Sequence, residues 1–173
     1  SRALTGVHFV SATNGFAVGE AGTILRTVNG GATWTAQMSG TGVTLRDVHF
    51  TKSTTGIAVG DSGTVHRTTN SGSTWTEILS ESEFTYWAVY FADTTNGWVV
   101  GQQESSGSQF GFILKTSDGG ATWISQLQGI AAGPNFGTRA LYGVHFGDSL
   151  RGVVVGFGGT LLRTSDGGAT WAL

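Results

Sequence analysis

The stretch that decides the fold is Thr164–Trp171, TSDGGATW, which occurs in this chain in four exact or looser copies. The same letters stand at Thr116–Trp123, and the looser copies TVNGGATW and TTNSGSTW occupy Thr27–Trp34 and Thr68–Trp75. The third letter is Asp in two copies and Asn in two. Asp and Asn side chains both accept hydrogen bonds from nearby backbone N–H groups, so the pattern indicates a turn rather than a catalytic acid.

We therefore interpret the phrase as structural. Its glycines can take the positive φ of a tight reversal, and its final Trp returns to the sheet as a large apolar plug. The positions to which we assign this role are Asn29, Trp34, Asn70, Trp75, Asp118, Trp123, Asp166 and Trp171.

Two further anchors repeat with the phrase. GFAVG (Gly15–Gly19) and VHF (Val7–Phe9) each recur three times, at steps of 41, 41 and 55 residues, whereas the tryptophans step by 41, 48 and 48. The differences indicate two seven-residue insertions on either side of Trp123. The spacing predicts one domain, 1–173, of four repeats at about 1–40, 41–81, 82–128 and 129–173.

Each repeat has the pattern of four short strands. In the first repeat they are expected at Leu4–Val10, Phe16–Gly19, Thr23–Arg26 and Thr33–Gln37, joined by tight polar turns. Such an antiparallel meander cannot bury both of its faces alone, so the copies must pack face to face around an axis. The predicted fold class is all-β: a β-propeller of four four-stranded blades, as a closed ring or as part of a larger or assembled propeller.

Composition excludes several classes of function. Of 173 residues 29 are Gly and 1 is Pro, 12% are charged, and the net charge is −2. A chain this weakly charged offers nothing to nucleic acid. There is no Cys for disulfide or thiolate chemistry, and no apolar run approaches the ~20 residues of a membrane-spanning helix.

The four phrases resemble the Asp-box, or bacterial neuraminidase repeat, whose pattern is Ser/Thr-x-Asp-x-Gly-x-Thr-Trp. The wider repeat, LTGVHFVSATNGFAVGEAGTILRTVNGGATW, is similar to the photosystem II stability/assembly-factor-like family of β-propellers. This resemblance implies radially arranged four-stranded blades. It leaves open whether the chain is a sialidase, an assembly factor, a receptor or a secreted binding module, and assembly-factor relatives carry more than four blades.

The two insertions, Gln102–Gly111 and Gln128–Arg139, and the connection at Glu81–Trp87 are expected to form loops on one face of the array, opposite the turn phrases. Aromatic rings interleaved with an amide and a cation suit stacking on sugars or gripping a protein segment, although such loops can also pack on themselves. The candidate binding residues on this loop face are Phe84, Tyr86, Trp87, Phe110, Asn135, Phe136, Arg139 and Tyr142.

Two other sets recur once per repeat. A cation row, Arg26, Arg67, Lys115 and Arg163, precedes the turn phrases; it resembles part of a partner-binding arginine patch of the assembly-factor-like family, and the alternative is a contact inside each blade. His8, His49, His145 and Tyr90 share one place in the innermost strands. They could ring the channel, but without carboxylate or thiolate partners we expect satisfied polar residues and no metal.

A sialidase-like site would need an arginine triad, a Tyr nucleophile with its Glu, and an acid/base Asp. Arg139 is the only arginine carried by an insertion, so we expect a non-catalytic module without a cofactor. It is expected to be extracellular or at the cell surface, with periplasmic or lumenal sites left open. The expected partner is a protein or a second copy of the chain, in a dimer or fibre through a shortened last strand, with a glycan as the alternative.

Overall fold

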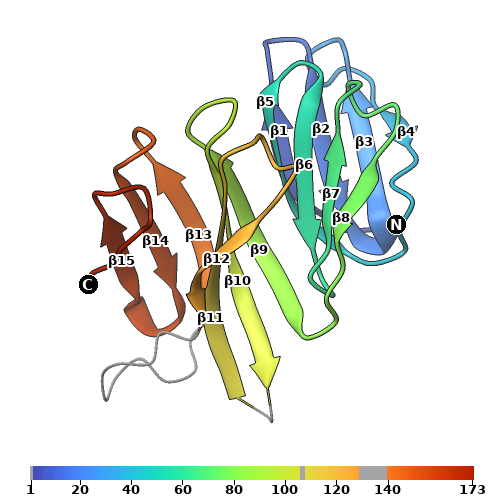
Figure 1. The fold of residues 1–173 in the computed structure, drawn as a ribbon. Helices are drawn as coiled ribbons and strands as arrows, with labels where there is room; N and C mark the ends of the chain where they lie inside the picture. Colours follow the sequence, from blue (N-terminus) through green and yellow to red (C-terminus); the bar gives the residue numbers. More distant parts are fainter. Residues whose placement is uncertain (1, 106–107, 129–139) are drawn as a thin grey trace. The chain divides into compact units, whose positions relative to one another are not determined.

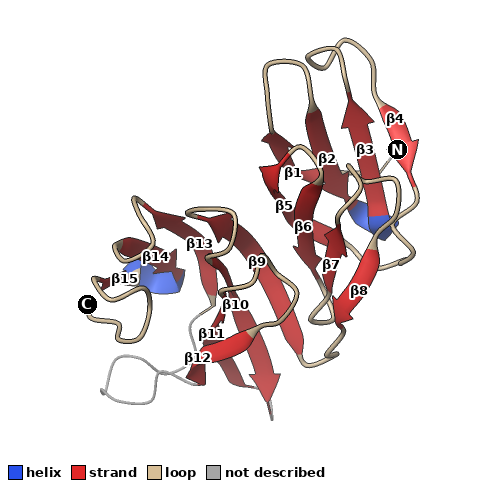
Figure 2. Ribbon diagram, turned by 45° about the horizontal axis from the view of Figure 1, so that its top comes forward, coloured by secondary structure: helices blue, strands red, loops and turns tan. Residues whose placement is uncertain are grey.

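The computed structural model describes residues 2–105, 108–128 and 140–173, and strands dominate it (Figures 1 and 2). The first sheet has the order β1 (Leu4–Phe9), β2 (Gly15–Gly19), β3 (Thr23–Thr27) and β4 (Thr35–Gln37). The second has β5 (Leu45–Lys52), β6 (Thr55–Gly60), β7 (Val65–Thr68) and β8 (Thr76–Leu79). Neighbouring strands are antiparallel, as the meander pattern of the repeat predicts.

The third sheet contains β9 (Phe84–Phe91), β10 (Gly97–Ser105), β11 (Ser108–Thr116) and β12 (Ile124–Gln128). The fourth has three strands, β13 (Leu141–Phe146), β14 (Gly152–Gly156) and β15 (Leu161–Thr164). Where a fourth strand was expected there is a single bridge between Arg163 and Ala172. Short 3-10 turns, Glu20–Gly22 and Phe157–Gly159, follow β2 and β14.

One sequence expectation about the loops is wrong. Gln102–Gly111 does not form a loop, because β10 and β11 continue as a hairpin with Gln103 opposite Phe110 and Glu104 opposite Gln109. Phe84, Tyr86 and Trp87 likewise belong to β9 rather than to a connection. Extra residues in a hairpin can be accommodated by lengthening both strands, since each added pair keeps its backbone hydrogen bonds.

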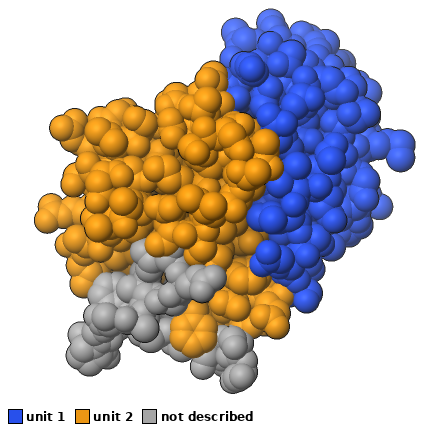
Figure 3. Space-filling view, viewed as in Figure 1, with its two compact units in different colours: residues 1–82 blue, residues 83–173 orange. Residues whose placement is uncertain are grey.

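The chain divides into two compact units, residues 1–82 and 83–173, coloured separately in Figure 3. In unit 1, one face of the first sheet packs on the second sheet. The Phe16 and Phe50 rings stack with centroids 3.8 Å apart. The buried cluster around them consists of Phe16, Val18, Ile24, Leu45, Val48, Phe50, Ala58 and Trp75.

Unit 2 repeats this arrangement with different residues. Trp98 of β10 stacks on Phe146 of β13 at 3.4 Å, and its Nε1 donates a hydrogen bond to the carbonyl of Gly167 at 3.2 Å. The surrounding cluster is Trp98, Val100, Ile113, Leu141, Phe146, Val154 and Leu162. Each unit is therefore held by one joint between two sheets, with an aromatic stack at its centre. We call these the unit 1 joint and the unit 2 joint.

The glycines of the GFAVG anchor are explained by close approach. A Cβ on Gly56 would lie 2.6 Å from the Phe50 ring, and one on Gly152 would lie 2.5 Å from the Phe146 ring. The Phe of each VHF anchor therefore lies over the glycine of the neighbouring strand, and a larger residue would displace the ring from the joint.

Candidate partner-binding surface

The four turn phrases share one hydrogen-bond pattern. In the third copy, Asp118 Oδ1 accepts from the Thr122 N–H at 2.9 Å, and Asp118 Oδ2 accepts from the Thr122 hydroxyl at 2.6 Å. The Gly120 N–H donates to Thr116 Oγ1 at 3.0 Å. Asp166 accepts the same bonds from Thr170 in the fourth copy.

Asparagine reproduces this geometry in the first two copies. Asn29 Oδ1 accepts from the Thr33 N–H at 2.9 Å, while its Nδ2 donates to the Thr33 hydroxyl at 2.8 Å. Asn70 does the same with Thr74. The side chain closes a turn on its own backbone in all four copies, and a charge is not needed for that.

The turn carboxylates are held ionised. Hydrogen bonds from the Thr170 hydroxyl and N–H lower the pKa of Asp166 to about 2. For Asp118, burial raises the pKa, but the hydrogen bonds from Thr122 outweigh it and bring the value to about 2. A general acid needs a pKa near the working pH, so these groups are unsuited to proton donation.

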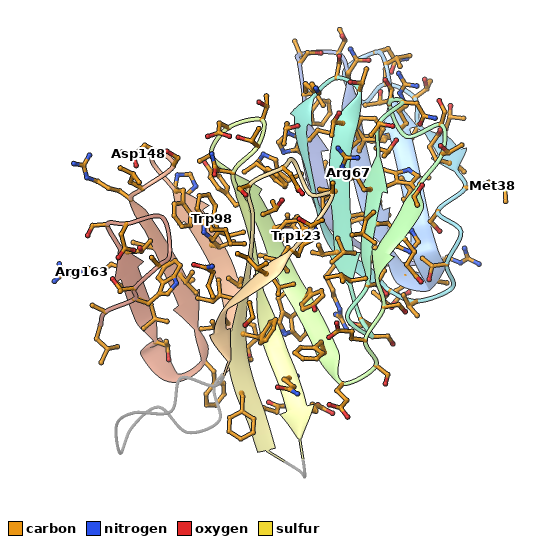
Figure 4. All side chains as sticks on the ribbon, viewed as in Figure 1. Met38, Arg67, Trp98, Trp123, Asp148 and Arg163 are labelled. Carbon is orange, nitrogen blue, oxygen red and sulfur yellow. The ribbon has the colours of Figure 1, made fainter. Side chains whose placement is uncertain are left out.

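The tryptophans that end the phrases lie against the Phe of their own sheet. Their rings meet edge to face at centroid distances of 5.9 to 6.0 Å, in the pairs Phe9–Trp34, Phe50–Trp75, Phe91–Trp123 and Phe146–Trp171. Trp75 is buried and the other three are half-buried. The fully buried tryptophan of the fold is instead Trp98, which belongs to the GWVVG anchor. Figure 4 labels both Trp98 and Trp123.

The structure separates the candidate binding residues of the loop face. Asn135, Phe136 and Arg139 lie outside the described residues. Tyr86 is 1% exposed and is not accessible to a ligand, which corrects the expectation for this residue. Its ring lies near Phe84 and Phe112, whose centroids are 4.7 Å apart, so these three rings form an aromatic cluster of their own.

Trp87 and Tyr142 do come together at the surface of unit 2. Their rings meet edge to face at 5.6 Å, and Trp87 Nε1 donates to Gln102 Oε1 at 3.4 Å. Tyr142 is 46% exposed and Trp87 is half-buried. We call Trp87 and Tyr142 the bulge surface; Gln102, which is 7% exposed, is buried beneath it and accepts the hydrogen bond of the indole. Phe110 is half-buried on β11, opposite Gln103.

Both aromatic residues stand at β-bulges. The register of each first strand shifts by one residue, and the extra residue of the bulge is Thr5, Arg46, Trp87 or Tyr142 in the four sheets. A bulge re-aims its side chain away from the regular alternation of the strand.

Sequence reasoning missed Arg46, which occupies the bulge of unit 1. Its Nε and Nη2 donate to the two carboxylate oxygens of Asp61 at 2.7 and 3.1 Å. The signal that could have found it is the aligned quartet LTGV, LRDV, YWAV and LYGV, whose second letter is the bulge residue in every repeat.

Two members of the cation row lie over the joints. The Arg26 guanidinium is 5.8 Å from the centre of the Phe16 ring, and the Lys115 ammonium is 5.6 Å from that of Trp98. Arg67 is half-buried and Arg163 is exposed, and both are labelled in Figure 4. Arg26 and Lys115 thus make cation–π contacts in their joints.

The histidines pair within their units. His8 and His49 lie 4.4 Å apart by ring centroid in unit 1, and Tyr90 and His145 lie 4.6 Å apart in unit 2. Burial, with a smaller contribution from His8, lowers the pKa of His49 to about 4. Among the described residues no three His, Cys, Asp or Glu side chains are grouped to hold a metal ion.

The other acidic side chains of unit 2 are engaged locally. Asp93 and Asp148 accept hydrogen bonds from the turns that follow them. Glu83 and Glu104 accept from Gln103 and Gln109 at 3.4 and 3.2 Å. Within the part of the chain that the structure describes, no helix is long and apolar enough to cross a membrane.

These sheets, turns and joints define a β-propeller protein built from neuraminidase-type repeats. The family model of the photosynthesis system II assembly factor YCF48 matches residues 37–128, more than half of the chain. The chain belongs to this family. No curated protein matches it.

Solved structures share the fold at low identity. YCF48 bound to D1 peptide has a TM-score of 0.62 at 16% identity, covering 99% of this chain and 68% of that one. YCF48 from Cyanidioschyzon merolae has a TM-score of 0.60 at 16% sequence identity, and the match covers 98% of this chain and 84% of that one. The GH74 enzyme of Niastella koreensis has a TM-score of 0.72 at 20% sequence identity, and the match covers 94% of this chain but 28% of the enzyme.

Proposed function

We propose that the chain is a non-catalytic module that binds an extended segment of a partner protein on the bulge surface of unit 2. The observation that carries the proposal is the edge-to-face pair of Trp87 and Tyr142, with Gln102 beneath it. Large aromatic rings with a polar atom at the edge are the side chains that most often dominate protein interfaces.

The chemistry of the surface suits a peptide. Tyr142 offers a hydroxyl and an open ring edge, which can hydrogen-bond to a peptide group and pack on an apolar side chain. A structure of YCF48 holds a D1 peptide, which supports a protein segment as the class of ligand for this chain. The proposed location is outside the cytoplasm, in a lumen, the periplasm or the extracellular space.

Hydrolysis has weaker support, although GH74 enzymes share the fold. A glycosidase needs two carboxyl groups across an open site, one of them with a raised pKa. Asp118 and Asp166 instead have lowered pKa values and are committed to their turns.

Binding can be measured by titrating a D1-derived peptide, and separately a panel of neutral oligosaccharides, into the full chain. We expect a peptide complex that Trp87→Ala or Tyr142→Ala weakens about tenfold or more, since truncating a central aromatic costs about 2 kcal/mol. Ile124→Ala, at an exposed apolar residue of β12 in the same unit, should leave the affinity unchanged.

The two possible failures are distinguishable. Oligosaccharide binding that depends on Trp87 would show that the bulge surface recognises glycans and not a peptide. Peptide binding that none of these substitutions alters would remove the bulge surface as the site.

A further inference from the structure

Two sheet faces expose apolar residues whose counterparts in other repeats are buried. On the first sheet, Leu4, Val7 and Phe9 are 53%, 61% and 43% exposed. Their counterparts in the second sheet, Leu45, Val48 and Phe50, are at most 3% exposed, because that face is covered in the unit 1 joint. We call the face of Leu4, Val7 and Phe9 the front face.

The last sheet also exposes apolar residues whose counterparts are buried, but on its other face. Val153, Val155 and Leu161 are 41%, 44% and 50% exposed. In the third sheet the same positions are held by Trp98, Val100 and Ile113, which are completely buried in the unit 2 joint. We call the face of Val153, Val155 and Leu161 the rear face.

The front and rear faces are therefore the two halves of one joint. In both formed joints, a face of the rear type packs on a face of the front type, with Phe16 on Phe50 and Trp98 on Phe146. The first sheet exposes a front face, and the last sheet exposes a rear face. Exposed apolar faces of this kind mark interaction sites.

The surroundings of the turn glycines show independently that the front face of the first sheet is uncovered. A Cβ on Gly72 would meet the Phe16 ring of the preceding sheet at 2.8 Å, and one on Gly168 would meet Trp98 Nε1 at 3.0 Å. At the corresponding Gly31, the nearest described atoms belong to Trp34 and Phe9 of its own sheet. The first turn phrase thus has a receiving position that no described residue from another sheet occupies.

Both faces are hollowed where a neighbouring sheet would sit. A hollow of about 440 Å³ on the first sheet is lined mainly by apolar side chains, among them Leu4, Val7, Leu25 and Trp34. One of about 410 Å³ on the last sheet has Val153, His145 and Arg163 among its lining residues. Arg163 holds the place of Arg26 and Lys115, which cap the stacks in the formed joints, and it extends away from the sheets in Figure 4.

We propose that the rear face of one copy of this chain docks on the front face of a second copy and forms a third joint like the two inside each chain. A second copy fits both faces, because it carries the two halves of the joint in the same register. Phe9 of one copy would pack on Val153 of the other, with Arg163 over the first turn phrase. The two faces differ, so the interface is heterologous and gives a closed ring or a growing chain.

The test is the mass of the full chain by light scattering across a concentration series, for wild type and for one-face variants. Wild type is expected at two or more times the 18.0 kDa of one chain. Val7→Glu and Val155→Glu should each be monomeric, because a buried, unpaired charge opposes the joint. Met38→Glu, at a residue that directly follows β4, is 86% exposed and is labelled in Figure 4, should assemble like wild type.

Mixing the two variants gives the decisive result. Val7→Glu keeps its rear face and Val155→Glu keeps its front face, so an equimolar mixture should form a 1:1 dimer that does not grow further. Circular dichroism of each variant establishes that it is folded. A wild type that stays at the mass of one chain, or an assembly that both substitutions leave intact, would overturn the proposal.

Discussion

The unit 1 and unit 2 joints are built on one plan with different residues. The Phe16–Phe50 and Trp98–Phe146 rings stack with the same interplanar angle, 11°, under a cation from the third strand of the sheet. Phe16 and Trp98 occupy corresponding places in the two stacks, as do Arg26 and Lys115 above them. Both joints therefore combine a stacked pair of flat rings with a cation above it, although the rings differ in size.

The two joints differ at one strand position, which pairs with Ala58 in unit 1 and with Val154 in unit 2. In unit 1, His66 is 2% exposed, and its nearest ionic partner is Glu77 Oε2 at 3.7 Å from Nε2, beyond hydrogen-bond distance. In unit 2 the same position is Leu162. The units differ in their turn phrases as well, with Asn29 and Asn70 in unit 1 and Asp118 and Asp166 in unit 2. The consequence is a different response of each unit to truncation and to acid.

The largest effect should come from removing the stacked ring of unit 2. Trp98→Ala is expected to lower the free energy of unfolding by about 3–5 kcal/mol, since the side chain is completely buried and leaves a cavity. Trp98→Phe should keep the stack but lose the hydrogen bond to Gly167, at about 1 kcal/mol. Urea denaturation measures both.

Phe16→Ala is the matched variant in unit 1. It removes a smaller ring that donates no hydrogen bond, so its cost should fall at the lower end of the same range. Equal costs for Trp98→Phe and Trp98→Ala would show that the indole contributes by its polar edge and not by stacking.

Acid should loosen unit 1 first. Burial lowers the pKa of His49 to about 4, with a further contribution from His8, and burial also lowers the pKa of His66 despite the opposing effect of Glu77. The unfolded chain therefore binds more protons than the folded one between pH 6.5 and about 4, and stability falls as the pH drops through this window. The total loss in the free energy of unfolding is a few kcal/mol at most, because each unit by which folding lowers a pKa corresponds to about 1.4 kcal/mol.

Amide hydrogen exchange at pH 7 and pH 4.5 measures this for each unit. Protection in β5 and β7 should fall more than protection in β13 and β15. His66→Leu copies the unit 2 residue into unit 1 and should raise stability by about 1–2 kcal/mol and reduce the acid loss. Equal loosening of both units with His66 intact would contradict the assignment.

The sequence predicted the sheets well, because they depend on short-range periodicity and on turn residues. The three anchors located every strand of the first repeat within a few residues, and Asp, Asn and Gly at fixed places predicted the turns. Tyr86 and the hairpin at Gln102–Gly111 were misjudged for one physical reason. A polar or aromatic insertion can extend a hairpin as readily as it forms a loop, and only pairing across strands decides which.

The bulge surface was found only in part, for a related reason. Trp87 and Tyr142 stood out as aromatic residues near insertions, but the register shift that aims them depends on how β9 and β13 pair with their neighbours. Gln102 was seen as part of an insertion, and its bond to Trp87 follows from that pairing. Arg46 has no aromatic ring and lies in a repeat without an insertion, so only the alignment of the four repeats could have indicated it.

The smallest effect tests the difference between the turn phrases. Asp118→Asn gives the third copy the residue of the first two, whose amide makes the same bonds to the following Thr. At pH 7 the change should therefore stay within about 0.5 kcal/mol, whereas Asp118→Ala should cost about 1 kcal/mol by freeing the turn amides.

Because the pKa of Asp118 is lowered to about 2, the wild-type carboxylate contributes stability above pH 3.8 that is lost as the pH falls toward 2. The Asn variant should lack that acid-dependent loss, and a urea series at pH 7 and pH 2.5 measures it; a large loss for Asn at pH 7 would mean that the charge itself, and not the turn geometry, stabilises this copy.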